Sequence, residues 1–121
     1  MPRTVEFEDP KRLELIEELQ ASAVKEGAEI WKTLAGELSR PRKNRREINM
    51  WKLSKFTKEG ETVIVPGKVL GDGDLEHRID IAAFKFSEAA KKKIERSGGK
   101  FMSIKDLMKK NPKGSNLRLI G

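Results

Sequence analysis

Residue types on which many enzymes depend are absent or scarce in this sequence. It contains no cysteine and no tyrosine, and His77 is its one histidine. A chain without cysteine forms no disulfide and no thiolate metal site, which fits a reducing compartment. Any triad of acid, histidine and nucleophile has to include His77, which follows Glu76 in a polar stretch and is predicted to lie at the surface. We therefore expect no enzyme and no cofactor.

Long apolar segments are missing as well. No stretch approaches the roughly 18 consecutive apolar residues that would indicate a membrane span. The N-terminal residues contain acids and a proline but no apolar run, unlike a signal peptide. These absences predict a soluble, intracellular protein with no membrane partner. At 121 residues, the chain is long enough to bury a core without disulfides.

The acids and glycines in the middle of the chain do not match a known ligand loop. Asp72, Asp74 and Glu76 alternate as in a calcium loop, but the glutamate that ends such a loop would fall near Ala83. The glycines at 67, 71 and 73 lack the Gly-Lys-Ser/Thr sequence of a phosphate loop and are typical of turns. We expect no metal and no small-molecule substrate.

Charged residues, in contrast, are abundant: they make up 37% of the chain, whose net charge is +7. Residues 40–58 account for all of this net charge, with eight basic residues against the single acid Glu47. The remainder of the chain holds 18 residues of each sign, an abundance that also fits the surface ion-pair networks of a thermophile. The basicity is therefore local and predicts a polyanionic partner.

A helix is predicted to begin near Arg45 in this basic stretch. Asn44 and Glu47 have the spacing of an N-cap and its capping-box acid, and Ile48 and Trp51 follow on one helical face. Cations are unfavourable at a helix N-terminus, but a phosphate is favourable there. We interpret the stretch as a phosphate clamp, with a solvated charged linker as the alternative. Its candidate RNA-binding residues are Arg40, Arg42, Lys43, Arg45, Arg46, Lys52 and Lys55.

A second basic cluster occurs later and comprises Lys91, Lys92, Lys93, Arg96 and Lys100. Three consecutive lysines span most of a helical turn, so some of them face water. A solvated face is the favoured interpretation of the cluster as a whole. Lys91 and Lys92 are retained as candidates for RNA contact.

Helical periodicity characterises the first third of the chain, and strand-like runs appear in the rest. Residues 1–39 hold five bases and nine acids and are predicted to form a helical hairpin that packs on the domain or faces a protein. Pro66 and Gly67 are predicted to form a type II turn with a positive φ at Gly67. Asp9, Ser87 and Ser103 are predicted helix caps. The predicted elements are helices at 10–25, 30–38, from about 45, 87–96 and 103–110, and strands at 62–65, 68–70, 78–84, 100–102 and 117–120.

This order predicts an α/β fold in which N-terminal helices are followed by irregular strand-strand-helix turns with a small mixed sheet. We expect a single domain over residues 1–121. Its parts are the acidic hairpin (1–39), the basic stretch with its helix (40–58) and a mixed α/β core (59–121).

The two tryptophans, Trp31 and Trp51, are at core spacing in their predicted helices, and both are expected to be buried. Few aromatic side chains then remain to stack on unpaired bases. Recognition of a folded RNA by its shape and backbone is the favoured mode.

Four segments of the sequence are distinctive: RPRKNRREIN (40–49), VIVPGKVLG (63–71), AAFKFS (82–87) and NPKGS (111–115). Together they resemble the archaeal large-subunit ribosomal proteins of the eighteen-e family, which are kin to the bacterial large-subunit protein numbered fifteen. The likeness extends over nearly the whole chain from about residue 9.

The resemblance implies a structural constituent of the large ribosomal subunit, located in the cytoplasm, that binds large-subunit ribosomal RNA beside other ribosomal proteins and has no enzymatic activity. It places Arg42, Lys43, Arg45, Arg46 and Lys68 in segments that lie on RNA in such proteins. A free-standing RNA or DNA chaperone is the alternative function. A small nucleotide-using enzyme is a third class.

Overall fold

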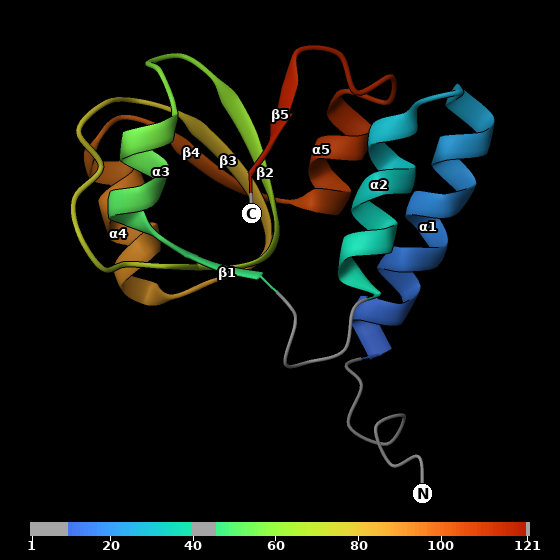
Figure 1. Cartoon of the computed structure of the whole chain (residues 1–121), viewed down its shortest axis with the longest axis horizontal. Coiled ribbons are helices and arrows are strands. Elements are labelled where there is room, and N and C mark those ends of the chain that lie inside the picture. The colour runs from blue at the N-terminus through green and yellow to red at the C-terminus, as the bar shows by residue number, and fades with distance from the viewer. Residues whose placement is uncertain (1–9, 40–45, 121) are drawn as a thin grey trace, which may run out of the picture.

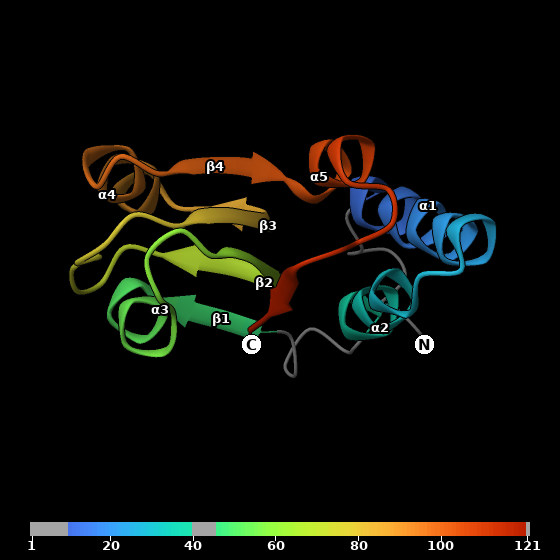
Figure 2. The same cartoon turned by 90° about the horizontal axis from the view of Figure 1, so that it is seen from above.

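A parallel sheet lies between two layers of helices in the computed structural model, which describes residues 10–39 and 46–120 (Figures 1 and 2). In chain order, the elements are α1 (Pro10–Glu26), α2 (Glu29–Leu38), β1 (Arg46–Asn49), α3 (Met50–Phe56), β2 (Thr62–Leu70), β3 (Asp80–Phe86), α4 (Glu88–Arg96), β4 (Lys100–Ser103), α5 (Ile104–Lys110) and β5 (Leu117–Leu119). The predicted α/β class with N-terminal helices is therefore confirmed.

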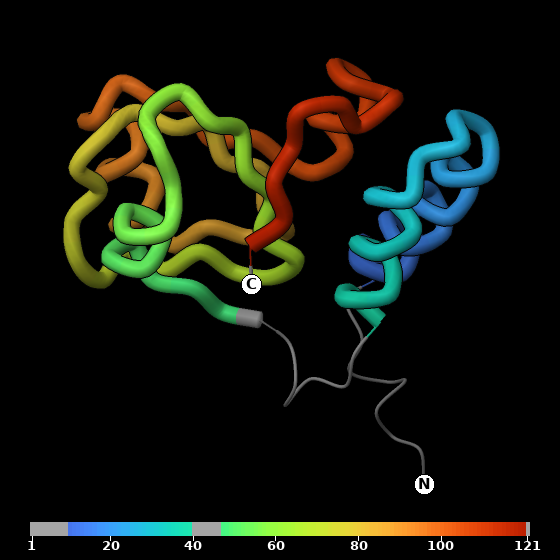
Figure 3. The backbone as a smooth tube through the Cα atoms, turned by 45° about the horizontal axis from the view of Figure 1, so that its top comes forward, coloured from blue at the N-terminus to red at the C-terminus, as the bar shows by residue number. Residues whose placement is uncertain are grey.

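The sheet has the strand order β1-β2-β3-β4, and β5 pairs with β2 as well. All of the described pairs are parallel. Strand β5 pairs with Thr62–Ile64 and β1 with Gly67–Leu70, so the two short strands share one edge of β2. Figure 3 follows the chain from α5 back to the sheet at β5.

Alternation along the central strands produces two separate apolar cores. Val63 and Val65 join the core that α3 and α4 cover, whereas Ile64 between them joins the core of α1, α2 and α5. The same alternation assigns Ala82 to the helical hairpin and its two neighbours in β3 to the opposite core. Because both faces are covered, these strands are apolar almost throughout, as buried parallel strands usually are.

The predicted hairpin at Pro66 and Gly67 is wrong. Both residues are buried inside one continuous strand, β2, and Gly67 has no positive φ. The register between β2 and β3 shifts between Val65 and Lys68, which gives the proline, without an N–H to donate, a place at an irregularity of the ladder. Since no hairpin reverses the chain here, the described sheet is parallel and not mixed.

The predicted helix start near Arg45 is also wrong. Arg46–Asn49 is the strand β1, and α3 begins only at Met50. Buried Ile48 pairs with Val69 of β2, and this tertiary pairing outweighs the local capping signal. The proposed cap, Asn44, lies outside the described residues. At Arg46 there is therefore no helix N-terminus whose dipole a cation would oppose.

The other helices follow the predicted signals. Ser87 and Ser103 accept hydrogen bonds from the backbone N–H groups of Ala90 and Asp106, each at 3.1 Å, and so cap α4 and α5. The hairpin of α1 and α2 forms as expected, although its predicted cap Asp9 lies outside the described residues. Within the described part of the chain, no helix is long and apolar enough to cross a membrane.

The two tryptophans differ. Trp31 is fully buried, as predicted, but Trp51 is 51% exposed, which contradicts the prediction that it belongs to a core. The reason is the shift in the start of α3. The helix now buries Met50 and Leu53, and Trp51 lies on the opposite side.

Candidate nucleic-acid interface

The residues predicted to contact RNA occupy different parts of the fold. Arg40, Arg42, Lys43 and Arg45 lie outside the described residues. Arg46 begins β1, where its backbone is in register with Gly67. The described part of the basic stretch therefore begins with an edge strand of the sheet, and its helix α3 follows only at Met50.

Lys52 and Lys55 lie on α3, where Lys52 is half-buried and Lys55 is exposed. The Lys55 ammonium is 5.6 Å from the ring centre of Phe56, whose side chain is itself 47% exposed. These two lysines do not line the same surface as the remaining candidates.

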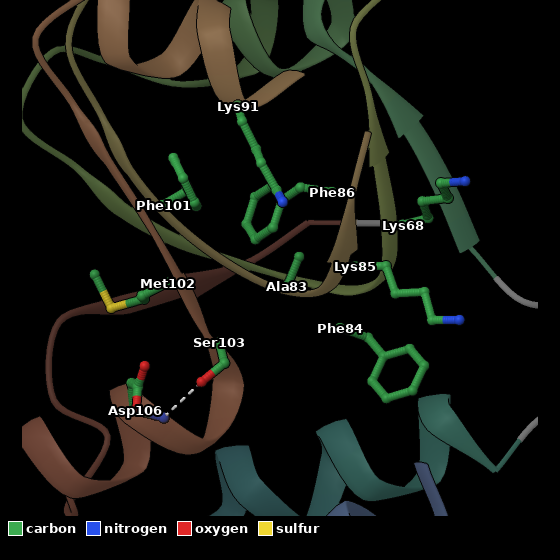
Figure 4. Close-up of a pocket in the computed structure, with 10 residues that line it drawn as sticks. All are labelled: Lys68, Ala83, Phe84, Lys85, Phe86, Lys91, Phe101, Met102, Ser103 and Asp106. Atoms are coloured by element: carbon green, nitrogen blue, oxygen red, sulfur yellow. Dashed lines mark hydrogen bonds between the residues drawn. The ribbon is translucent and has the colours of Figure 1, made fainter. Parts of the chain in front are cut away.

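Lys68 and Lys91, which are far apart in sequence, come together around an open hollow of about 500 Å³ (Figure 4). A third lysine, Lys85, joins them. We call this surface the lysine hollow. It is lined by Lys68, Ala83, Phe84, Lys85, Phe86, Lys91, Phe101, Met102, Ser103 and Asp106. The remaining candidate, Lys92, is exposed on α4 and is not among the lining residues.

The topology explains why a hollow forms at this place. Strand β3 ends at Phe86 and continues into α4, which covers one face of the sheet, whereas β4 ends at Ser103 and continues into α5 on the other face. After these two neighbouring parallel strands, the chain therefore crosses to opposite faces of the sheet. Open α/β sheets commonly bind ligands in the crevice at such a switch point.

Positive charge in the lysine hollow comes from three elements. Lys68 on β2 and Lys85 on β3 are exposed and are direct partners across the two strands. Lys91 on α4 forms an ion pair of 3.3 Å with Glu88. Lys68 also neighbours Glu47 on β1, but no carboxylate of the described residues lies within 4.0 Å of its ammonium group.

Aromatic rings line the same hollow. The Lys85 ammonium is 5.5 Å from the ring centre of Phe84, and the Lys91 ammonium is 5.9 Å from that of Phe101. The rings of Phe101 and Phe86 pack at 5.5 Å with a tilt of 54°. Such cation–π contacts direct the lysine side chains along the walls of the hollow.

The sequence prediction did not single out Lys85, although it is the one basic residue of β3 and follows the apolar run Ile81–Phe84. Lys93, assigned with its neighbours to a solvated face, is instead an anchor. Its ammonium donates to the Gly71 carbonyl at 2.7 Å and to the Gly73 carbonyl. Lys92 and Arg96 are exposed.

Metal and acid–base chemistry find no support in the described part of the chain. No group of three or more histidines, cysteines, aspartates or glutamates within residues 10–39 and 46–120 is placed to hold a metal. His77 is half-buried, with Nε2 at 2.7 Å from the Thr57 hydroxyl, whose proton goes to the Leu53 carbonyl at 2.6 Å. This arrangement ties the end of α3 to the loop before β3.

Comparison with known proteins agrees with the distinctive segments of the sequence. The family described as "Ribosomal protein 60S L18 and 50S L18e" matches residues 12–121. The protein named "Large ribosomal subunit protein eL18" of Methanothermobacter thermautotrophicus is 41% identical over 120 residues, which is 99% of both chains. Its counterpart in Methanoregula boonei is 44% identical over 120 residues, also 99% of both chains.

A smaller share is matched in Methanopyrus kandleri, whose protein of the same name is 43% identical over 111 residues, 88% of this chain and 87% of that one. These relatives are ribosomal proteins and not enzymes, in agreement with the expected absence of catalysis. The match over nearly the whole length shows that the chain belongs to the family of ribosomal protein 60S L18 and 50S L18e.

Proposed function

We propose that this chain is a structural constituent of the large ribosomal subunit that binds folded large-subunit ribosomal RNA through its phosphate backbone. It acts as one domain, in the cytoplasm and next to other ribosomal proteins. Membership of the ribosomal family supports this role. The observation that carries the RNA-binding part is that Lys68, Lys85 and Lys91 line one hollow.

Three ammonium groups on one open surface can contact several phosphates of an RNA backbone at once. Lysine binds phosphate as a point charge, and each neutralised phosphate releases counterions, which drives association. The lysines come from β2, β3 and α4, so the fold holds them apart at fixed places. Because the charges are held at separate positions, they favour an RNA backbone of matching shape over other polyanions.

Part of the basic stretch is next to β2. Arg46 is the first residue of β1 and is in register with Gly67, which precedes Lys68 in the chain. We propose that Arg40, Arg42, Lys43, Arg45 and Arg46 contact phosphates together with Lys68, Lys85 and Lys91. Lys52, Lys55 and Lys92 add contacts from α3 and α4.

Sedimentation of a native lysate tests the proposed place in the ribosome. The protein is expected to run with large subunits and to leave them only at high salt. A protein that stays at the top of the gradient at low salt would contradict the proposal.

Competition distinguishes a ribosomal constituent from a free-standing chaperone. Purified large-subunit ribosomal RNA is expected to compete for a labelled fragment of itself far better than unrelated RNA or DNA of equal length. Equal competition by all of these nucleic acids would favour the chaperone.

A further inference from the structure

Trp51 is the largest exposed apolar side chain in the described part of the chain, and it lies beside two lysines. We infer that the outer face of α3 is a stacking surface on which an unpaired RNA base lies against Trp51 while lysines hold its flanking phosphates. This inference rests on the proposed RNA-binding function and adds a second, separate contact to it.

The arrangement of side chains on α3 follows from helical geometry. Met50 and Leu53 face the core, and Thr57 just after the helix is also buried. At about 100° per residue, the opposite side presents a continuous arc of roughly 140°. Around this arc the order is Trp51, Lys55, Lys52 and Phe56, so that the two lysines lie between two aromatic rings.

The neighbouring loop fixes the place from which Trp51 projects. Its backbone N–H donates to the Asp72 carbonyl at 3.1 Å. Gly73 approaches so closely that an added Cβ would lie 2.5 Å from the Cβ of Trp51. Lys93 holds this loop through the carbonyl oxygens of Gly71 and Gly73. The exposed tryptophan is therefore presented from a fixed backbone, which lowers the entropy lost when a base stacks on it.

The charges favour RNA over a protein neighbour. Helix α3 has two lysines and no acid in its seven residues. The acids in the adjoining loop are Asp72, Asp74 and Glu76. Asp74 is within 3.9 Å of the Lys93 ammonium, and the backbone N–H of Glu76 donates to the Ser54 hydroxyl of α3 at 3.1 Å. Lysine is depleted from protein–protein interfaces, whereas aromatic rings beside cations are usual where unpaired nucleotides bind. The exposed Trp51 also removes the objection that too few aromatic side chains are available for stacking.

The two tryptophans of the chain make the inference directly measurable. Trp31 is fully buried and donates its indole N–H to the Pro112 carbonyl at 2.6 Å, so its fluorescence should not respond to RNA. Oligouridylate of about ten nucleotides, whose bases are unstacked, is the probe. It is expected to quench the wild-type emission. The variant Trp51→Phe, which retains only Trp31, is expected to show no change.

Binding measurements separate stacking from charge. Trp51→Leu is expected to weaken binding of oligouridylate and of large-subunit ribosomal RNA by roughly 5- to 150-fold, with an unchanged salt dependence. Lys52→Gln/Lys55→Gln is expected to lower the slope of log affinity against log salt by about 1.4 on the single-stranded probe. Trp51→Phe, which keeps an aromatic ring, should bind more tightly than Trp51→Leu.

Two results would overturn the inference while leaving the proposed function standing. The first is that oligouridylate does not quench the wild-type emission and that the Trp51→Leu variant binds large-subunit RNA as tightly as the wild type. The second is a Trp51→Leu variant that enters subunits poorly but binds RNA normally, which would assign the face to a protein neighbour. A wild-type protein that binds no RNA and runs free of subunits would instead contradict the proposed function itself.

Discussion

The indole N–H of Trp31 on α2 donates to the carbonyl oxygen of Pro112, 81 residues later in the chain, at 2.6 Å. The loop that carries Pro112 is closed by Asn111, whose side-chain amide donates to the Ser115 carbonyl at 2.8 Å. Gly114 of the same loop, at φ 67°, lies against Ile30. The distinctive segment at 111–115 is thus a structural link between the loop after α5 and the helical hairpin.

Replacing this tryptophan should weaken the link. Trp31→Phe removes the hydrogen bond and part of a fully buried ring, so we expect the free energy of unfolding to fall by about 2–4 kcal/mol. Urea denaturation measures this change. The matched control is Trp51→Phe, on an exposed side chain, which should change stability by less than about 0.5 kcal/mol. Equal effects of the two substitutions would show that the link contributes nothing.

Gly73 is required for both conformation and space. It has φ 90°, and an added Cβ would lie 2.5 Å from that of Trp51 and 2.9 Å from its backbone nitrogen. Gly73→Ala should therefore lower the free energy of unfolding by more than about 2 kcal/mol, since strain and steric overlap add.

Gly60 provides the control, because it has nearly the same φ, 88°, but no atom within 4 Å of an added Cβ. Gly60→Ala should cost only the conformational part, about 1 kcal/mol. The difference between the two melting curves isolates the contact with Trp51. Equal melting temperatures of the two variants would show that Gly73 does not lie against Trp51 of α3.

Acid titration should reveal Glu61. The backbone N–H of Lys58, which donates to Glu61 at 2.5 Å, and then the guanidinium of Arg118 at 3.3 Å hold the pKa of this carboxyl below its usual value. A carboxyl whose pKa is lower in the folded state stabilises the fold. This contribution is fully present at a pH above the unfolded-state pKa of about 4.3, and it is lost as the pH falls through the folded-state pKa.

The variant Glu61→Gln should therefore be less stable than the wild type at pH 7 and should converge with it at acid pH. Denaturation at a series of pH values measures this difference. A stability gap that stays constant down to the acid end would mean that the ionised carboxylate is not the stabilising form.

The pairing of Lys68 with Lys85 leads to a prediction on affinity. Lys68→Gln/Lys85→Gln removes two charges from the lysine hollow and should lower the salt slope of binding to large-subunit RNA by about two units. The stability of the free protein should stay equal or rise slightly, because the two side chains are direct partners of like charge. Lys25→Gln/Lys32→Gln, on exposed residues of α1 and α2, is the matched control and should leave the slope almost unchanged.

Much of the fold was predictable because its signals are local. The apolar spacing of α2 and the serine caps of α4 and α5 act within a few residues, and the structure has all of them. The strand β1 was not predictable in this way. Its capping-box spacing favours a helix, but Ile48 forms a ladder with Val69, which is distant in sequence.

The candidate site shows the same division. Positive charge and family motifs pointed to Lys68 and Lys91, but the lysine hollow depends on the opposite crossover directions of α4 and α5. No local pattern reports that β2 passes straight through Pro66 and Gly67, which brings Lys68 beside Lys85. The exposure of Trp51 likewise depends on where α3 begins, and one helical register decides which side of it faces the core.

The basic stretch should account for most of the salt dependence of RNA binding. With roughly seven phosphate contacts, the slope of log affinity against log salt should be about −5 to −6 for the wild type. Replacing Arg42, Lys43, Arg45 and Arg46 with glutamine should reduce the steepness of this slope by three to four units. The free protein should keep its stability, because the one described residue of the four lies in a strand and not at a helix end.

A control must remove the same charge elsewhere without loss of structure. Lys93 is unsuitable, since it anchors the carbonyl groups of Gly71 and Gly73. Glutamine at Lys25, Lys32, Lys109 and Lys110, which are exposed on α1, α2 and α5, removes four charges from the helical layer. This variant should retain most of the slope. Equal losses from the two quadruple variants would mean that only net charge matters, and a preformed clamp at residues 40–58 would have to be abandoned.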